Sequence, residues 1–391
     1  MRRTNIVALA PSPAQHKKLL ELADYCSRLW NELSYRRRQS YFGGYINWNF
    51  KDLYDKYKGI VGSATAQQIE RKNSEAWRSF FALLSRKKAD RLPANIASVK
   101  PPGYWKDRRT NTRKLLILIR CDCYRFEEKI LRLPKKLNIR WKGHPNWARW
   151  IRQGLLTLIY DKVNTKWYAH QSVEVEIPHQ PLSDKRAYVD LGVINLLTIA
   201  IDDKRKTLAY SGRPALADWW YISRRINKLK ALAKSMNNKE STKQIRRLFR
   251  IRRKRFQHYV CTMVYRAVRE LWHNGVSTIV LGDLTGILEN TRGRRRTNTM
   301  THNFWSHRFL VQRILNQAEE FGINVELVDE RGTSSSCLRC NSQQVIRRGR
   351  LLACRACGLE AHRDTVGAVN IGVVFGGRVN GVMAHPLEIS F

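Results

Sequence analysis

Four acidic residues stand where a side chain can do chemistry, at the end or the start of an apolar run. Asp190 ends "AYVD", Asp283 ends "STIVLGD", Glu330 follows "NVELVD" and Asp364 opens "DTVGAVNI". Ligands of an open α/β sheet bind beyond the carboxyl ends of its parallel strands, where three of the four acids are expected. Carboxylates that converge in this way hold two Mg²⁺ ions in phosphodiester hydrolysis. The pattern therefore predicts a nuclease site with two metal ions.

Each acid has a structural explanation when it is taken alone. Asp364 at the start of a helix is a common N-cap residue, whose carboxylate accepts hydrogen bonds from backbone N–H groups. Gly192, two residues after Asp190, permits a close approach of the backbone at that strand end. Because the acids occur together and in this order, they favour a metal site.

The cysteines near the C-terminus have the spacing of a second metal site. Cys337 and Cys340 form one C-x-x-C pair, and Cys354 and Cys357 form another after thirteen intervening residues. Four thiolates on two turns close a tetrahedral Zn²⁺ site and leave no position for water. We therefore expect one structural Zn²⁺, with iron or a metal-free clip as the alternatives.

The charge balance indicates an anionic polymer as the partner. Lys and Arg number 72 against 32 Asp and Glu, and the net charge of +40 is spread over the whole chain. Such an excess repels itself unless a polyanion neutralises it, so nucleic acid is the expected partner. The alternative is an anionic membrane surface, but the sequence has no stretch of about 18 apolar residues and no lipidation signal.

Two stretches mix Arg with aromatic residues, 35–42 and 245–256. This mixture suits phosphate contact and base stacking, although a charged helix face over a core has the same composition. The N-terminal residues lack the apolar core of a secretory signal, which predicts a reducing, cytoplasmic compartment. The four other cysteines are scattered, which argues against a disulfide framework.

The first half is predicted to be a β-domain that contains a helical block. Apolar residues follow helical spacing from about residue 13 to 93. Short β-rich runs separated by Pro, Gly and Asn follow from about 96 to 180, which is typical of a small barrel or sandwich. The strand-like segment 4–10 can join them, and the helices are then an insertion.

The second half is predicted to be an RNase H-like α/β fold. After a linker at 178–184, three strands precede a long helical stretch from about 216 to 274. The strand that ends at Asp283, an amphipathic helix, the strand before Glu330 and a last helix from Asp364 complete the order.

Three motifs of this chain resemble the TnpB family, compact RNA-guided DNA endonucleases of insertion sequences that are related to type V CRISPR effectors. "VDLGVINLLTIAID" resembles the first RuvC motif, and "TSSSCLRC" with "CRACG" resembles the zinc ribbon. "HRDTVGAVNI" is similar to the third RuvC motif, H-R-D-x-N-A-A-x-N-I. Asp364 and Asn370 match this motif, whereas Val366 and Gly367 replace its first Asn and first Ala.

The resemblance implies a domain organisation. Residues 1–12 and 96–180 would be a wedge-like β-barrel domain, and 13–95 its helical recognition insertion. Residues 184–336 and 358–391 would be a RuvC nuclease domain that the zinc ribbon 337–357 interrupts. The ribbon would then return Asp364 to the sheet.

The resemblance also implies the partners. These are a guide RNA and target double-stranded DNA with a short flanking motif, since guide pairing supplies the sequence specificity. The protein would be prokaryotic and cytoplasmic, and associated with the nucleoid when it is bound to DNA. Whether it is a monomer or a dimer stays open.

The second RuvC motif departs from the family. Its usual Glu before Asp-Leu is replaced by Gly282 in "IVLGDLTGI". Asp283 is a poor substitute, because a step of one residue along a strand turns the side chain to the other face. Glu330 can reach from the next strand about 4.8 Å away, as in a subset of relatives with the same G-D-L-x-G-I pattern, and Glu289 is a weaker candidate. We therefore predict that Asp190, Glu330 and Asp364 hold two catalytic Mg²⁺ ions.

Two other functions stay open. With an inactive site, the protein would be an RNA-guided DNA binder or repressor, and a third possibility is a DNA-strand-transfer transposase. The segment 291–305 carries four Arg beside the second acidic motif. It is either a solvated loop or a lid that admits single-stranded DNA.

Overall fold

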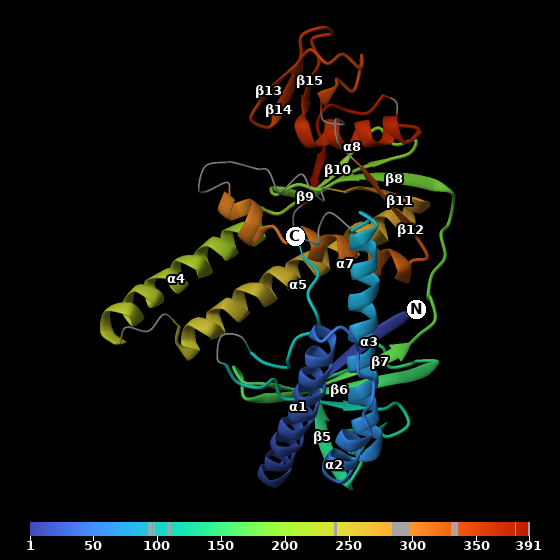
Figure 1. The fold of residues 1–391 in the computed structure, drawn as a ribbon. Helices are drawn as coiled ribbons and strands as arrows, with labels where there is room; N and C mark the ends of the chain where they lie inside the picture. Colours follow the sequence, from blue (N-terminus) through green and yellow to red (C-terminus); the bar gives the residue numbers. More distant parts are fainter. Residues whose placement is uncertain are drawn as a thin grey trace. The chain divides into compact units, whose positions relative to one another are not determined.

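The computed structural model describes residues 1–92, 96, 98–107, 111–237, 241–283, 298–329, 335–379 and 381–389 (Figure 1). Glu330, Glu289 and the Arg-rich part of segment 291–305 lie outside these residues. The chain divides into two compact units, Met1–Glu176 and Ile177–Phe391. Their boundary adjoins the segment 178–184 that was expected to be a linker.

The first unit is built on one antiparallel sheet in the order β2-β6-β7-β1-β5-β4-β3. Strand β1 lies in the middle of this order, between β7 and β5, so the N-terminal segment joins strands that follow more than a hundred residues later. No pairing joins the outer strands β2 and β3 among the described residues, so closure into a barrel stays a prediction. The strands are β1 (Arg2–Ala10), β2 (Leu116–Ile119), β3 (Arg125–Glu127), β4 (Ile130–Leu133), β5 (Leu137–Lys142), β6 (Arg152–Asp161) and β7 (Lys166–Glu174).

Three helices occupy the chain between β1 and β2, as the helical spacing predicted. They are α1 (Pro13–Phe42), α2 (Lys51–Val61) and α3 (Ser63–Lys88). Helix α1 starts at a capping box, in which Ser12 Oγ accepts from the Gln15 N–H and Gln15 Oε1 accepts from the Ser12 N–H. The apolar faces of these helices share one buried core with the sheet.

A buried ion pair joins α1 to α3. The Arg37 side chain is 0% exposed and donates to Glu70 Oε1 and Asn73 Oδ1, both at 2.8 Å. Burial lowers the pKa of Arg37, because the charged guanidinium has lost its water. The two acceptors compensate this loss and fix the helices side by side.

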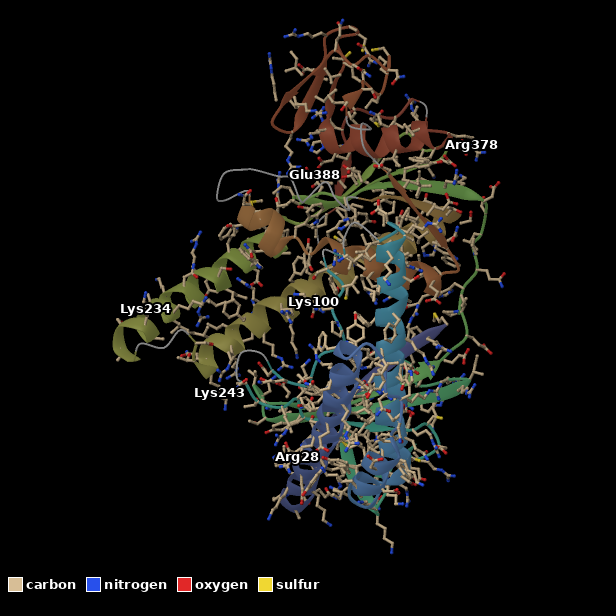
Figure 2. The ribbon with its side chains drawn as sticks, in the orientation of Figure 1. Arg28, Lys100, Lys234, Lys243, Arg378 and Glu388 are labelled. Atoms are coloured by element: carbon tan, nitrogen blue, oxygen red, sulfur yellow. The ribbon has the colours of Figure 1, made fainter. Side chains whose placement is uncertain are left out.

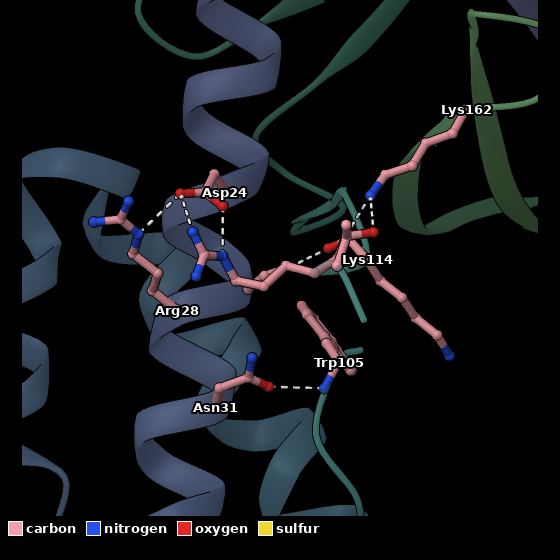
Figure 3. A network of polar contacts seen from close by, with 9 residues as sticks. Asp24, Arg28, Asn31, Trp105, Lys114 and Lys162 are labelled. Carbon is pink, nitrogen blue, oxygen red and sulfur yellow. Dashed lines mark hydrogen bonds and ion pairs between the residues drawn. The ribbon is translucent and has the colours of Figure 1, made fainter. Parts of the chain in front are cut away.

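The segment that leads from the helices to β2 is fastened to α1 (Figure 3). Arg113 Nε and Arg28 Nε donate to the two carboxylate oxygens of Asp24, at 2.6 and 2.8 Å. The Trp105 N–H donates to Asn31 Oδ1 at 2.7 Å. These contacts hold an irregular connection against a regular helix.

The second unit contains a mixed sheet in the order β12-β11-β8-β9-β10-β16. Strands β8, β11 and β12 are parallel neighbours, and β9 runs antiparallel to β8 and β10. This order agrees with the RNase H-like arrangement expected from the sequence, and the mixed α/β architecture is confirmed. The strands are β8 (Lys185–Asp190), β9 (Asn195–Ile201), β10 (Leu208–Ser211), β11 (Val276–Asp283), β12 (Asn324–Asp329) and β16 (Leu387–Ile389).

Helices cover both faces of this sheet (Figure 1). One face packs on α5 (Lys243–His273) and α7 (His307–Glu320) through a large apolar cluster, and the other packs on α8 (Arg363–Val374). The helical stretch predicted as one is two helices, because α4 (Arg213–Asn237) packs beside α5 as a hairpin through their apolar faces. None of the helices in the described residues is long and apolar enough to span a membrane.

The cysteine-rich segment forms a separate antiparallel sheet of β13 (Val345–Arg348), β14 (Leu351–Cys354) and β15 (Glu360–His362). Strand β15 lies beyond residue 357, where the ribbon was expected to end, and α8 starts directly after it. The ribbon therefore leads without a linker into the helix that carries Asp364.

Candidate active site and metal centre

Asp190 ends strand β8 on the face that α8 covers. Tyr188 belongs to the apolar cluster on the α8 side, and residues two apart on a strand share a face. A β-carbon added to Gly367 of α8 would lie 2.9 Å from Asp190 Oδ2 and 3.1 Å from its Cγ. The Asp190 carboxylate is therefore in direct contact with the backbone of α8.

The turn between β8 and β9 needs glycine, as the sequence suggested. A β-carbon on Gly192 would lie 2.5 Å from the carbonyl oxygen of Asn195. This close approach lets β9 start at Asn195 and pair with β8, so that Thr198 lies opposite Asp190. The turn therefore places the buried Asn195 beside the end of β8.

Asp364 is not the N-cap of α8, so that structural explanation is wrong. The N-cap is His362, whose Nδ1 accepts from the Asp364 N–H at 3.3 Å. The Asp364 carboxylate is 14% exposed, and its Oδ2 accepts from Asn195 Nδ2 at 3.0 Å and Arg350 Nη1 at 2.9 Å. The side chain thus points to the β8–β9 turn and to the ribbon.

Asp190 and Asp364 lie at one corner of the second unit. Asp364 and Gly367 are three residues apart on α8, a spacing that puts side chains on the same helix face about 5–6 Å apart. Gly367 contacts Asp190, and Asn195 joins Asp364 to the strand that pairs with β8. Two acids 174 positions apart are therefore brought to the same corner, where the first turns of α8 cross the end of β8.

A buried hydroxyl group near this corner is evidence that the site fits a hydrated cation. Thr198 is 1% exposed and lies opposite Asp190 across the strand pair, and its Oγ1 has no hydrogen-bond partner among the described residues. A buried polar atom without a partner calls for a bound water or ion. Two carboxylates and a hydroxyl are also the hard oxygen donors that Mg²⁺ prefers. The residues present therefore fit a divalent cation with its waters.

The third acid was expected at the ends of the strands beside β8. Strands β8, β11 and β12 end side by side, and the backbone of Asp283 pairs with that of Asp329. Val280 packs on the α8 side, so position 282 of β11 shares the face of Asp190, and a glycine stands there. Glu330, Glu289 and the side chain of Asp283 lie outside the described residues.

The four cysteines of the ribbon form a compact cluster. The Sγ atoms of Cys337, Cys340, Cys354 and Cys357 all lie within 4.8 Å of one another, the one such group of metal-binding side chains among the described residues. Two Sγ–Sγ distances are 3.6 Å, which is too long for a disulfide. Zn–S bonds of about 2.3 Å in a tetrahedron give a similar edge, roughly 3.8 Å. The cluster can hold a zinc ion.

The backbone around the cluster favours a thiolate. Hydrogen bonds from the backbone N–H groups of Cys357 and Ala356 lower the pKa of Cys354 to about 7. A metal-binding cysteine must lose its proton, so these donors prepare Cys354 for that role.

Two contacts of the site were not predicted. Arg350 is one of several Arg in the ribbon, and nothing in the sequence distinguishes it from its neighbours. Asn195 lies inside the "VDLGVIN" motif, but a single amide in an apolar run is no signal of a metal site. Only the fold brings both of them to Asp364.

The ribbon is tied to α8 at a second point. Asn370, which matches the later Asn of the third RuvC motif, donates from Nδ2 to the carbonyl oxygen and the hydroxyl of Ser336, at 3.0 and 3.2 Å. Together with Arg350, this contact fastens the base of the ribbon to the helix that carries Asp364.

The α4–α5 hairpin presents a strongly basic surface. Ten of its exposed Lys and Arg residues are defined here as the hairpin surface, and two of them, Lys234 and Lys243, lie toward the end where the two helices are connected (Figure 2). Asp218 is one of its few acids and pairs with Arg255 at 2.6 Å. The members are Arg224, Arg225, Lys228, Lys230, Lys234, Lys243, Arg246, Arg247, Arg253 and Lys254.

A basic pocket of about 450 Å³ occurs in the first unit, between α3 and the sheet. Its lining includes Arg2, Lys72, Arg152, Gln153 and Ser172. Cations mixed with amide and hydroxyl groups match the donors that contact a phosphate backbone.

Two family models match this chain. The IS605 OrfB model, described as "Probable transposase", matches residues 170–288. The model described as "Cas12f1-like, TNB domain" matches residues 307–371, which include the ribbon and most of α8.

Two relatives have similar sequences. The chain is 34% identical over 402 residues to the TnpB-like protein ORF457 of Acidianus two-tailed virus, covering 95% of this chain and 86% of the relative. It is 29% identical over 233 residues to the CRISPR-associated endodeoxyribonuclease Cas12f1 of Sulfoacidibacillus thermotolerans, covering 55% of this chain and 52% of that protein.

Two solved structures have a similar fold. A Cas12f1–sgRNA–target DNA complex has a TM-score of 0.54 at 12% identity, over 91% of this chain and 82% of that one. The mini-RNA-guided endonuclease CRISPR-Cas_phi3 has a TM-score of 0.53 at 10% identity, over 99% and 94%. At these identities the likeness concerns the fold alone.

Proposed function

Since the chain belongs to the TnpB-like family, we propose that it is an RNA-guided DNA endonuclease. The observation that carries the proposal is that α8, which carries Asp364, packs its Gly367 against the Asp190 carboxylate at one corner of the mixed sheet. The net charge of +40 supports nucleic acid as the partner. The similarity to a protein named as a CRISPR-associated endodeoxyribonuclease supports the same reaction.

Asp190, Asp364 and Glu330 are the proposed ligands of two Mg²⁺ ions. Bound there, the ions would activate a water and stabilise the leaving oxygen of the scissile phosphodiester. Glu330 directly follows β12 in the sequence, and the end of β12 pairs with the end of β11, which supports Glu330 as the third ligand. The glycine at position 282 supports it too, since β11 offers no carboxylate at that point.

The remaining residues of the site have structural roles in this proposal. Asn195 holds the Asp364 carboxylate, Arg350 connects the ribbon to it, and Gly367 leaves room for the carboxylate of Asp190. Cys337, Cys340, Cys354 and Cys357 hold one Zn²⁺, which keeps the ribbon folded because so small a sheet has almost no core of its own.

The two units have different proposed roles. Residues 1–12 and 96–180 form the wedge-like domain and 13–95 the recognition insertion, which together contact the guide RNA and the DNA flanking motif. Residues 184–336 and 358–391 form the RuvC nuclease domain around the ribbon at 337–357. The basic pocket of the first unit and the hairpin surface of the second are the proposed phosphate contacts.

The test replaces Asp190 by Ala in protein purified with its co-purifying RNA, which is sequenced to define the target. Cleavage of the matching double-stranded DNA in Mg²⁺ should be abolished, whereas RNA-dependent binding of that DNA should persist. Asp203→Ala is the control, because Asp203 is an acid of the same unit that pairs with the surface Arg378, away from the site. Cleavage that survives in Asp190→Ala contradicts the proposal.

The third ligand is tested by a pair of variants. Both substitutions, Glu330→Gln and Asp283→Asn, remove a charge with little change of volume. Because Glu330 is the proposed ligand, Glu330→Gln should abolish cleavage, whereas Asp283→Asn should leave cleavage unchanged. The opposite result would assign the role to Asp283.

The transposase description of one matching family model favours a second candidate function, DNA strand transfer. A strand-transfer enzyme joins DNA ends without a guide, so treatment with RNase separates the two functions. Loss of DNA processing after RNase supports the guided nuclease. Target binding without any product at high Mg²⁺ would indicate the non-cleaving binder.

A further inference from the structure

Two hydrogen-bond donors meet on one oxygen of the Asp364 carboxylate. Asn195 Nδ2 donates at 3.0 Å and Arg350 Nη1 at 2.9 Å, and both reach Oδ2. A carboxylate oxygen offers about two lone-pair positions, so two donors occupy Oδ2. Neither of these bonds reaches Oδ1, which is the oxygen left to a cation.

The two donors differ in what holds them. Asn195 is 4% exposed and opens β9 directly after the tight turn at Gly192, so its amide is fixed by the sheet. Arg350 lies at the turn between β13 and β14 and is 40% exposed. A guanidinium beside the carboxylate repels an incoming cation, because the two carry charge of the same sign. The neutral, buried Asn195 is the donor that can stay when a cation binds.

We infer that Asn195 is a positioning residue, which fixes the rotation of the Asp364 carboxylate and presents Oδ1 as the oxygen that binds a divalent cation. The inference rests on the proposed function, because it assumes that Asp364 is a metal ligand. Residues that hydrogen-bond a ligating carboxylate orient it, and their loss lowers metal affinity or activity about 10- to 100-fold. Asn195 contacts Asp364 and, by this inference, affects cation binding only through the Asp364 carboxylate.

The test is Mn²⁺ binding followed by electron paramagnetic resonance, with the full-length, zinc-loaded protein. Mn²⁺ prefers the same hard oxygen ligands as Mg²⁺. Asn195→Ala removes the donor, and Asn195→Leu removes it while nearly keeping the buried volume, in case the alanine variant does not fold. Both should weaken Mn²⁺ binding about 10- to 100-fold relative to the wild type. Arg350→Ala should keep or increase the affinity, since it removes a competing cation.

Thr207, which directly precedes β10, provides a matched control because it contacts α8 at another residue. Thr207 is buried, and its Oγ1 lies 3.2 Å from Thr365 Oγ1, next to Asp364 in sequence. Thr207→Val removes this hydroxyl contact without touching the carboxylate. If Asn195 served only to hold α8 in place, Thr207→Val would weaken Mn²⁺ binding in the same way, whereas we expect it to leave Mn²⁺ binding unchanged.

The outcomes separate this inference from the proposed function. Asp364→Asn should eliminate the Mn²⁺ site. If it does, but Asn195→Ala and Asn195→Leu bind Mn²⁺ as the wild type does, the positioning role is wrong and the nuclease site stands. If Asp364→Asn itself binds Mn²⁺ as the wild type does, Asp364 is no ligand, and the inference and the proposed site fail together.

Discussion

The carboxylate of Asp190 lies against the backbone of Gly367, with Oδ2 only 2.9 Å from the point where a β-carbon would stand. An alanine at 367 therefore has to displace either the carboxylate or the helix. Since β8 belongs to the sheet and α8 packs tightly on it, the shift falls on the proposed ligands Asp190 and Asp364.

Gly367→Ala should reduce DNA cleavage about 100-fold, the scale expected for a misplaced catalytic group, while the protein stays folded. Gly372→Ala is the matched control on the same helix, because its β-carbon would meet Val379 and Tyr188 instead of the site. That variant should lower the melting temperature but keep the cleavage rate per folded molecule. Equal cleavage by the wild type and Gly367→Ala would show that Asp190 adapts without loss.

Zinc content tests the cysteine cluster. Purified protein should contain one equivalent of zinc, and Cys354→Ser should contain none, because three thiolates and a hydroxyl do not replace the four-sulfur site. Cys261→Ser is the control, since Cys261 lies on α5 outside the cluster. Removing zinc should also loosen the contact between Arg350 and Asp364, which limited proteolysis of the ribbon would report. A stoichiometric zinc content in Cys354→Ser contradicts the assignment.

Two adjacent arginines of α1 should differ strongly in their effect on stability. Arg37→Ala leaves Glu70 and Asn73 without their buried partner and should lower the free energy of unfolding by about 3–5 kcal/mol. Arg36→Ala removes an exposed ion pair with Asp52 and should cost about 0–1 kcal/mol. Urea denaturation of both variants checks this. Similar values for the two would mean that the Arg37 contacts are not formed.

The half-buried His170 of β7 makes the stability depend on pH. Burial lowers the pKa of His170 below the unfolded value of about 6.5, so the unfolded chain takes up the proton more readily. Above the unfolded pKa, His170 is neutral in both states and does not change the free energy of unfolding. As the pH falls through the unfolded pKa, the unfolded chain binds the proton first, so the free energy of unfolding decreases. Between about pH 7.5 and 5.5, the melting temperature of the wild type should fall more than that of His170→Gln. Parallel pH profiles would contradict the lowered pKa.

Much of the second unit was predictable because its signals are local. Period-two and helical apolar patterns predicted the strand and helix order, and the C-x-x-C spacing predicted which cysteines meet. Gly192 was recognised as a close approach for the same reason, since a tight turn is a local property. The two long helices α4 and α5 were predicted as one helical stretch, because a short charged connection hardly interrupts the helical spacing of apolar residues.

The parts that could not be predicted depend on contacts between distant residues. Asp364 is of a residue type that often caps helices, but His362 is the N-cap and the Asp364 carboxylate accepts from Asn195 and Arg350 instead. Asn195 lies 169 positions before Asp364, and Arg350 is one cation among many in the ribbon. Such partners are selected by the packing of α8 on the sheet, which no local pattern encodes.

The most direct measurement of the central claim is a diffraction experiment on crystals soaked in Mn²⁺, with data collected at the manganese absorption edge. The account predicts an anomalous peak between the carboxylates of Asp190 and Asp364, within coordination distance of both. A well-ordered site without such a peak, or a peak bound to only one of these two residues, would contradict it.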